Sequence, residues 1–330
     1  MKKILFIIVF CFAFLLTGCQ SYNEKNIKSA LNKNYGDLKG YYLTGNLEIY
    51  SGDNTYKYKV ETSHYDTNYR VRLLNKNNNH EQIILKNNDG VYVLTPSLNK
   101  SFKFQSNWPE NSSQIYLIES LLSDVEKDND IKLIDKKTNY IIESKLAYSN
   151  NKNLVKEKIY LDDKLNITRV EVFDEDNNLE MKMKFDEIDK KATFNDNYFE
   201  VKENMNAKET GTEETFNEIE DTIYPMYLPS GTYLSAEESV MVDEGERVIL
   251  SFAGESPFIM VQETVNISDD EDSIPVNGEI EFIGGTLGAV SKNSVNFISN
   301  GIEYYLSSDC MTKQELLQVA ESISPIVVMK

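Results

Sequence analysis

The sequence is poor in cysteine and in the residues that most often carry catalysis. Among 330 residues there are 3 cysteines, 2 histidines and 1 tryptophan. Cys11 lies within an N-terminal apolar run and Cys19 lies three residues after the run ends, which leaves Cys310 for the rest of the chain. A body with one cysteine cannot form an internal disulfide. We therefore expect its stability to come from packing, for which 41% hydrophobic residues suffice.

Positive charge is also scarce. Lys and Arg number 34 against 53 Asp and Glu, which gives a formal net charge of -19. Such a chain is repelled by nucleic acid and by anionic lipid headgroups. This excludes nucleic acid as a partner and a basic patch as the membrane contact. An acidic exterior suits a basic protein partner, and it equally suits a surface that is merely soluble.

The motifs of common active sites are missing. His64 and His80 lie in no HExxH or CxxC context, and we expect both to lie at the surface or in turns. Gly284-Gly285 is not followed by the Lys-Ser/Thr of a phosphate loop. The acidic runs 174–178 and 269–272 lack the ligand spacing of a calcium loop. We expect no enzyme activity, no metal and no cofactor.

The N-terminus has the three parts of a secretory signal. Lys2 and Lys3 precede an apolar run, Ile4 to Leu16, that is too short to span a bilayer as a stable helix. Leu16-Thr17-Gly18-Cys19 resembles the bacterial lipobox. The resemblance implies cleavage before Cys19, lipidation of its thiol and N-acylation, for example by palmitate. Several acyl chains anchor stably. We expect a lipid anchor on the extracytoplasmic face of the cell membrane; the alternative is a plain secretory signal.

Apolar periodicity divides the remaining chain into two folded parts. Helical spacing covers Ile27 to Tyr35 and Ile115 to Val125, and period-two segments predict strands between and after these helices. The strands of the first part are predicted at 41–50, 56–61, 69–74, 81–85, 91–94, 101–104, 131–134, 140–146, 155–161, 167–173 and 179–188. Few helices are available to cover so many strands, so one strongly curved antiparallel sheet around the helices fits better than a sandwich.

The second part is smaller. Its strands are predicted at 240–242, 247–252, 258–265, 279–283, 286–290, 294–298 and 302–306. A capping box, Thr312-Lys313-Gln314-Glu315, opens a last helix. The predicted organisation is a leader, a lipidated tether, a first domain, an acidic linker and a small α+β domain, at 1–18, 19–25, 26–202, 203–222 and 223–330.

A long string in the first domain resembles a known family. Asp89 to Phe104, DGVYVLTPSLNKSFKF, is followed by Trp108-Pro109 and Gln114-Ile115-Tyr116-Leu117. It resembles the YdcC and GerS type of sporulation and germination lipoproteins of endospore-forming bacteria, related to the LolA/LppX/RseB fold. The resemblance covers about 36–199 and implies an α+β fold: an incomplete, strongly curved antiparallel β-barrel with plugging helices. Tyr227 to Gly231, Val248 to Phe252 and Pro257 to Glu263 resemble the small α+β domain often attached to it.

The resemblance implies a non-catalytic, membrane-anchored scaffold or regulator of spore envelope or cortex formation or of germination. Its partner would be a cell-wall amidase or another envelope protein. The alternative is a carrier that binds lipid or acyl chains on the concave face of the sheet. An enzyme would require acidic residues that converge in a cleft. We expect Phe102, Phe104, Trp108 and Tyr116 to contact the ligand or partner; the alternative for all four is core packing.

Overall fold

The computed structural model describes residues 22–106, 108, 114–136, 139–148, 152–206, 219, 221–242, 245–265 and 273–323. The predicted leader, the predicted lipidation site Cys19, the acidic run 269–272 and most of the predicted linker lie outside these residues. Within the described residues no helix has the length and apolar character needed to span a bilayer.

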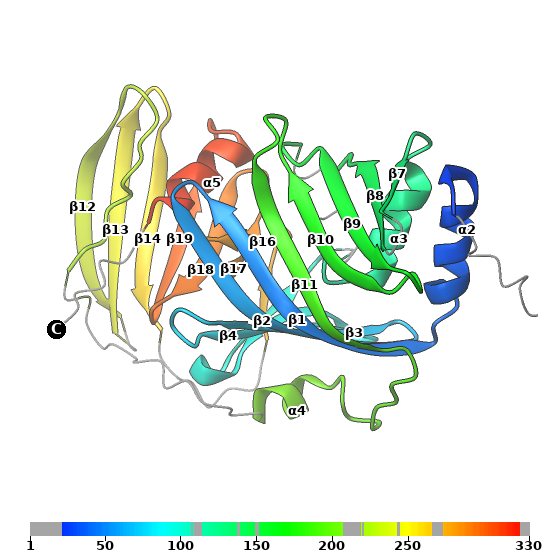
Figure 1. The fold of residues 1–330 in the computed structure, drawn as a ribbon. Helices are drawn as coiled ribbons and strands as arrows, with labels where there is room; N and C mark the ends of the chain where they lie inside the picture. The colour runs from blue at the N-terminus through cyan, green and yellow to red at the C-terminus, as the bar shows by residue number, and fades with distance from the viewer. Residues whose placement is uncertain are drawn as a thin grey trace, which may run out of the picture.

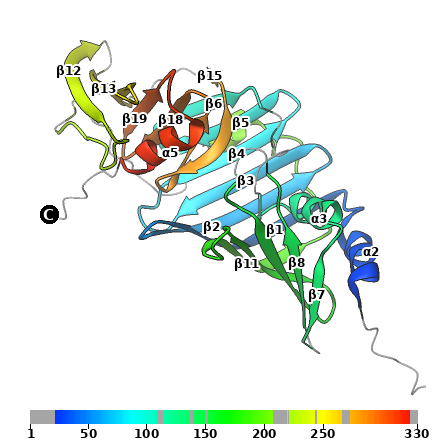
Figure 2. The ribbon, with the colours of Figure 1, turned by 90° about the horizontal axis from the view of Figure 1, so that it is seen from above.

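The first half of the chain builds most of one large, strongly curved sheet (Figures 1 and 2). Its helices are α2 (Glu24–Tyr35), η2 (Pro96–Leu98), α3 (Ile118–Lys127) and α4 (Val201–Asn206). Its strands are β1 (Gly40–Ser51), β2 (Asn54–Tyr65), β3 (Asn68–Asn75), β4 (Glu81–Asn87), β5 (Gly90–Thr95), β6 (Lys100–Phe104), β7 (Lys132–Asp135), β8 (Asn139–Lys145), β9 (Lys156–Asp162), β10 (Ile167–Phe173) and β11 (Leu179–Asp189).

The large sheet is open. Its strand order is β15-β6-β5-β4-β3-β2-β1-β11-β10-β9-β8-β7, where β15 (Ile274–Val276) comes from the second half of the chain. In the part of the chain that the structure describes, the end strands β15 and β7 do not pair with each other. Neighbours β1 to β6 and β7 to β11 pair antiparallel, and β1 joins the two groups by pairing with β11. The predicted incomplete, mostly β architecture is therefore confirmed.

The second half builds a smaller antiparallel sheet, order β12-β13-β14-β19-β18-β17-β16. These strands are β12 (Thr232–Val242), β13 (Gly245–Gly254), β14 (Phe258–Thr264), β16 (Glu279–Ile283), β17 (Thr286–Val290), β18 (Ser294–Ser299) and β19 (Ile302–Ser307). Helix α5 (Lys313–Glu321) begins at the predicted capping box, in which Thr312 and Glu315 cap each other's backbone N–H groups. Leu316, Val319 and Ala320 of α5 pack on one face of this sheet.

The hollow of the large sheet is filled from two sides. At one end the apolar stripes of α2 and α3, including Ile27 and Leu121, enter the core. At the other end β16 to β18 supply Ile280, Leu287 and Ile298 to the same core (Figure 2). A half-open sheet must bury its apolar face against something, and here it does so against its own chain.

The outer face of β4 and β5 is buried as well. Ile83 and Leu85 pack with Phe199, which lies just before α4. Burial on both faces explains why β4 and β5 read as continuous apolar runs and not as alternating strands. The segment that carries α4 thus belongs to the folded body, although its last residues were assigned to the predicted linker at 203–222.

Buried hydrogen bonds join the two sheets. Gln82 of β4 accepts through Oε1 from the Leu287 N–H at 2.6 Å and from the Thr286 hydroxyl at 2.9 Å. Its Nε2 donates to the Leu287 carbonyl at 3.3 Å. Asn75 of β3 donates to the Gly285 carbonyl at 3.0 Å. Satisfied polar groups in an apolar interface fix one relative position of the two sheets, because each would be costly if left unpaired.

Two carboxyl groups, one from β9 and one from α3, lie near each other. Glu157 of β9 is fully buried and accepts from the Ser144 hydroxyl at 2.8 Å, while Asp124 of α3 accepts from the Tyr148 hydroxyl. Burial raises the pKa of Asp124 to about 6. Burial and the nearby Asp124 raise the pKa of Glu157 well above its ordinary value. Both pKa shifts therefore favour the protonated forms of the two carboxyl groups.

Asp124→Asn is expected to stabilise the protein at pH 8 and to change little near pH 4. The folded pKa lies above the unfolded value of 3.8, so the wild type loses stability as pH rises from about 4 through 6. The loss amounts to at most about 3 kcal/mol. Urea unfolding at several pH values measures it. Asp130→Asn, at an exposed site nearby, serves as the control, and equal pH profiles for wild type and Asp124→Asn would contradict the expectation.

Candidate functional site

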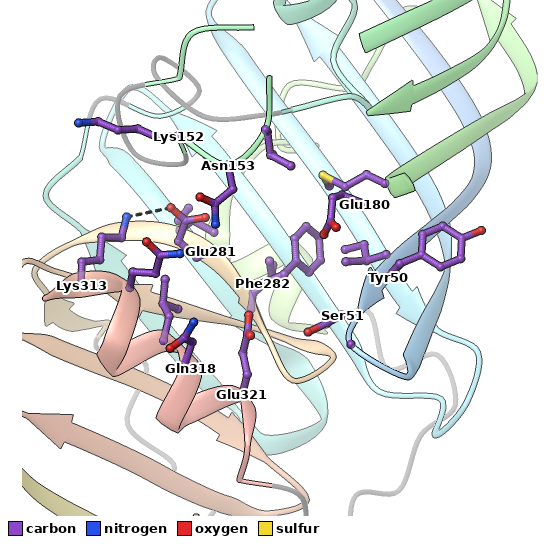
Figure 3. A pocket seen from close by; sticks show the side chains of 18 of the residues that line it. Tyr50, Ser51, Lys152, Asn153, Glu180, Glu281, Phe282, Lys313, Gln318 and Glu321 are labelled. Carbon is purple, nitrogen blue, oxygen red and sulfur yellow. Dashed lines mark hydrogen bonds and ion pairs between the residues drawn. The ribbon is translucent and has the colours of Figure 1, made fainter. Parts of the chain in front are cut away.

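A cleft of about 510 Å³ lies where the two sheets meet (Figure 3). One wall comes from the large sheet: the end of β1 with Tyr50 and Ser51, the start of β11 with Glu180, and the segment at Asn153. The other wall comes from β16 and α5 of the smaller sheet. The cleft has the size of an ordinary small-ligand site. It lies in a part of the hollow that is filled neither by α2 and α3 nor by β16 to β18.

Carboxyl groups reach the cleft from three elements. Glu180 comes from β11, Glu281 from β16 and Glu321 from the end of α5 (Figure 3). Glu321 is an exposed residue by surface area, but the partial burial of its carboxyl group at the cleft, followed by the charges of Glu180 and Glu281, raises its pKa. Burial and the charge of Asp174 raise the pKa of Glu180. A bound cation would lower the pKa values of Glu180 and Glu321, because an opposite charge favours the ionised form.

The remaining lining is mixed. Lys313 forms an ion pair with Glu281 at 3.1 Å. Phe282 and the ring of Tyr50 supply apolar surface, and the Tyr50 hydroxyl donates to Glu48 at 2.8 Å. Amide side chains line the cleft as well, at Gln114, Asn153, Gln314 and Gln318. This set can bind a group that carries positive charge, an apolar part and hydrogen-bonding capacity; a purely apolar chain would leave the charged groups poorly solvated.

Helix α5 places several lining residues by its periodicity. Lys313, Leu317 and Glu321 repeat every four residues and line the cleft, whereas Leu316 and Val319 face the core of the smaller sheet. The capping box made this helix predictable from sequence. Its cleft-facing side was not predictable, because these residues look like an ordinary solvated face.

The four predicted contact residues are all buried. Phe102 and Phe104 of β6 adjoin Leu287 and Ala289 of β17. Trp108 is 1% exposed and packs edge-on against Tyr69 with ring centroids 5.8 Å apart. Of the four, Tyr116 lines the cleft, and it is 2% exposed. Their contact with a ligand or partner stays a prediction, while their positions match the alternative of core packing.

The prediction that both histidines lie at the surface or in turns is wrong with respect to burial. His64 is 5% exposed and stacks on Tyr69, with Nδ1 3.2 Å from Glu119 of α3. His80 is 6% exposed, and burial lowers its pKa to about 4. His64 lies on β2 against α3 and His80 lies just before β4, and local sequence did not reveal that either is buried. Across the described ranges no group of three or more His, Cys, Asp or Glu side chains could hold a metal ion.

An open, strongly curved antiparallel sheet, with a smaller sheet seated in its hollow and a charged cleft at the seam, defines a protein of the incomplete β-barrel class. No protein-family model matches the chain. It is 35% identical over 314 residues to the sporulation protein YdcC of Bacillus subtilis (strain 168), a match that spans 94% of this chain and 93% of that protein. The chain belongs to the YdcC family of sporulation proteins, as the string at 89–104 indicated.

Several solved structures are similar at low identity. A MucA/MucB complex from Pseudomonas aeruginosa matches 92% of this chain and 98% of its own, at 12% identity and a TM-score of 0.31. A chain from the structure of the CwlD amidase of Clostridioides difficile in complex with the GerS lipoprotein matches 53% of this chain and 98% of its own, at 15% identity and a TM-score of 0.30. A LolA superfamily protein from Nitrosomonas europaea matches 54% and 98%, at 10% identity and a TM-score of 0.32.

Proposed function

We propose that the protein is a non-catalytic, lipid-anchored scaffold that binds a protein partner at the extracytoplasmic face of the membrane during spore envelope or cortex formation. Membership of the YdcC family supports the sporulation context. The lipobox-like Leu16-Thr17-Gly18-Cys19 supports the anchor at Cys19. The resemblance to germination lipoproteins makes a cell-wall amidase the first partner to test.

One observation carries the choice of scaffold over carrier: the hollow of the large sheet is filled by the chain itself. Side chains from α2, α3 and β16 to β18 share one core with the concave face. An acyl-chain carrier needs a continuous apolar cavity on that face. The cleft at the seam has carboxylates, lysines and amides in its walls beside its apolar residues. This favours a polypeptide partner with basic groups over a lipid.

The first experiment is capture from sporulating cells with the soluble body, residues 20–330, followed by native mass spectrometry of the same sample. Capture of a stoichiometric protein partner without bound lipid, in particular of a cell-wall hydrolase, would support the scaffold function. Lipid that copurifies in place of a protein would overturn the proposal and identify a carrier.

Neutralising the cleft is expected to weaken partner binding. Glu180→Gln combined with Glu321→Gln removes two carboxyl groups whose pKa values are raised. A basic group of the partner would stabilise the ionised form of both. We expect at least a tenfold higher Kd, corresponding to about 1.4 kcal/mol, in titration calorimetry. Glu175→Gln with Asp176→Asn, in the exposed loop between β10 and β11, is the matched control. Equal affinities for both double variants would place the partner outside the cleft.

A further inference from the structure

Strand β12 is a long, exposed edge of the smaller sheet. It pairs with β13 along Thr232 to Val242, and among the described residues no strand pairs with its other side. All of its interior residues are exposed. An unpaired edge presents a row of backbone N–H and C=O groups that another chain can join. Figure 1 shows β12 at the outer end of the molecule, away from the hollow of the large sheet.

The side chains of β12 follow a simple chemical order. Apolar residues lie toward its two ends: Tyr233 (60% exposed) and Leu234 (39%) at the start, Val240 (47%) and Met241 (65%) near the end. Two acidic residues, Glu237 and Glu238, lie between them. Natural edge strands often carry charge that discourages indiscriminate pairing. Here the charge is confined to the centre and is of one sign.

The exposed face of the sheet continues this surface beside β12. Ile249 of β13, Val261 of β14 and Tyr305 of β19 are direct neighbours across the strands. None of the three is fully buried, and Tyr305 is 41% exposed. Solvated apolar side chains in one cross-strand row offer contacts to side chains of an added strand or of the chain that follows it.

Charge decides which occupant fits the edge. A second copy paired antiparallel about the strand centre would bring Glu237 and Glu238 of both copies together, and like charges directly opposite are destabilising. The molecule as a whole carries -19, which adds to the repulsion. A segment with lysine or arginine at its centre and apolar residues on both sides would meet attraction along its whole length.

We propose that β12 is a docking edge for an extended segment of a partner protein that has basic residues at its centre and apolar residues at its flanks. The segment adds to the smaller sheet as an eighth strand through main-chain hydrogen bonds, the mode known as β-augmentation. Its basic centre lies opposite Glu237 and Glu238, which select it. The inference rests on the proposed partner-binding function but concerns a surface separate from the cleft.

The test uses the body, residues 20–330, and two defined peptides. Both alternate threonine and valine; one has a central lysine pair and the other a central glutamate pair. We expect saturable binding of the lysine peptide in fluorescence anisotropy, with a Kd at least tenfold lower than for the glutamate peptide. Hydrogen exchange should slow at residues 232–242 in the complex. The assay needs no natural partner, so its outcome is separate from that of the capture experiment.

Matched variants locate the interaction. In the wild type the two Glu237 oxygens accept from the Tyr224 hydroxyl at 2.7 Å and the Thr222 hydroxyl at 3.0 Å. Glu237→Gln keeps one oxygen as an acceptor and has an NH2 that can donate to the second hydroxyl, and together with Glu238→Gln it should abolish the preference for lysine. Glu175→Gln with Asp309→Asn makes the same charge change at exposed sites outside β12 and should preserve it. The proposal is overturned if neither peptide binds or both bind alike. It is also overturned if the free protein already protects β12, whether by its own chain or by a second copy seen as a dimer.

Discussion

Trp108→Ala is expected to lower the free energy of unfolding by about 3–5 kcal/mol, as large-to-small changes of buried aromatic residues do. The side chain is 1% exposed and belongs to the core shared by both sheets, with Tyr69 at its edge. Urea unfolding followed by circular dichroism measures the change. Tryptophan fluorescence cannot be used for the comparison, because Trp108 is the single tryptophan of the chain and the variant lacks it.

Two further variants separate packing from partner contact. Trp108→Phe retains a ring in the core and should lose clearly less stability than Trp108→Ala. Tyr233→Ala removes an aromatic ring that is 60% exposed, and its stability should stay within about 0.5 kcal/mol of wild type. If Trp108→Ala kept full stability but lost the captured partner, the side chain would have to be a contact residue and its buried position would be wrong.

Gln82→Ala is expected to cost about 2–4 kcal/mol, because it leaves buried backbone groups of Leu287 without partners and opens space between the sheets. The Leu287 N–H and carbonyl both bond to the Gln82 side chain in the native protein. The loss should be visible in urea unfolding. Faster hydrogen exchange in β17 should accompany it, since the smaller sheet would sit less firmly in the hollow.

Gln82→Met tests whether the hydrogen bonds matter apart from the volume. The methionine side chain fills similar space but cannot replace the hydrogen bonds of the amide, so we expect most of the loss of stability to remain. Gln105→Ala, just after β6 in the same sheet, is exposed and should change stability by less than about 0.5 kcal/mol. Unfolding curves for Gln82→Ala and Gln105→Ala that coincide would show that the buried amide does not hold the two sheets together.

Much of the fold was predictable because its signals are local. The turn at Ser51 to Asn54, the two long antiparallel series and the capping box at Thr312 and Glu315 each depend on residues close in sequence. Most of β12, from Thr232 to Ser239, was missed, because its interior residues are all exposed and show no apolar alternation. The short α4 was missed because it runs into the stretch where acidic composition suggested a linker.

The site was much less predictable. The cleft combines β1, β11, β16 and α5, and no spacing in the sequence connects Glu180 with Glu281 and Glu321. Phe102 and Phe104 were predicted as contacts, yet both are buried and line a narrow gap together with residues of β17. Which half of the sheet is covered by which later segment depends on long-range topology, and single-sequence periodicity carries no information about it.

Strand β15 has a consequence for how the chain acquires its structure. Its three residues run parallel to β6, with Ile274 beside Phe102. The hydroxyls of Ser101 and Ser273 lie 2.8 Å from each other, although 172 positions separate the two residues in the sequence. The edge of the large sheet is therefore completed by residues synthesised long after the rest of it. Such distant pairing slows folding. Until the last third of the chain has arrived, β6 is an open edge on which nascent copies can aggregate. A truncation before residue 274 should therefore impair the first domain as well as the second.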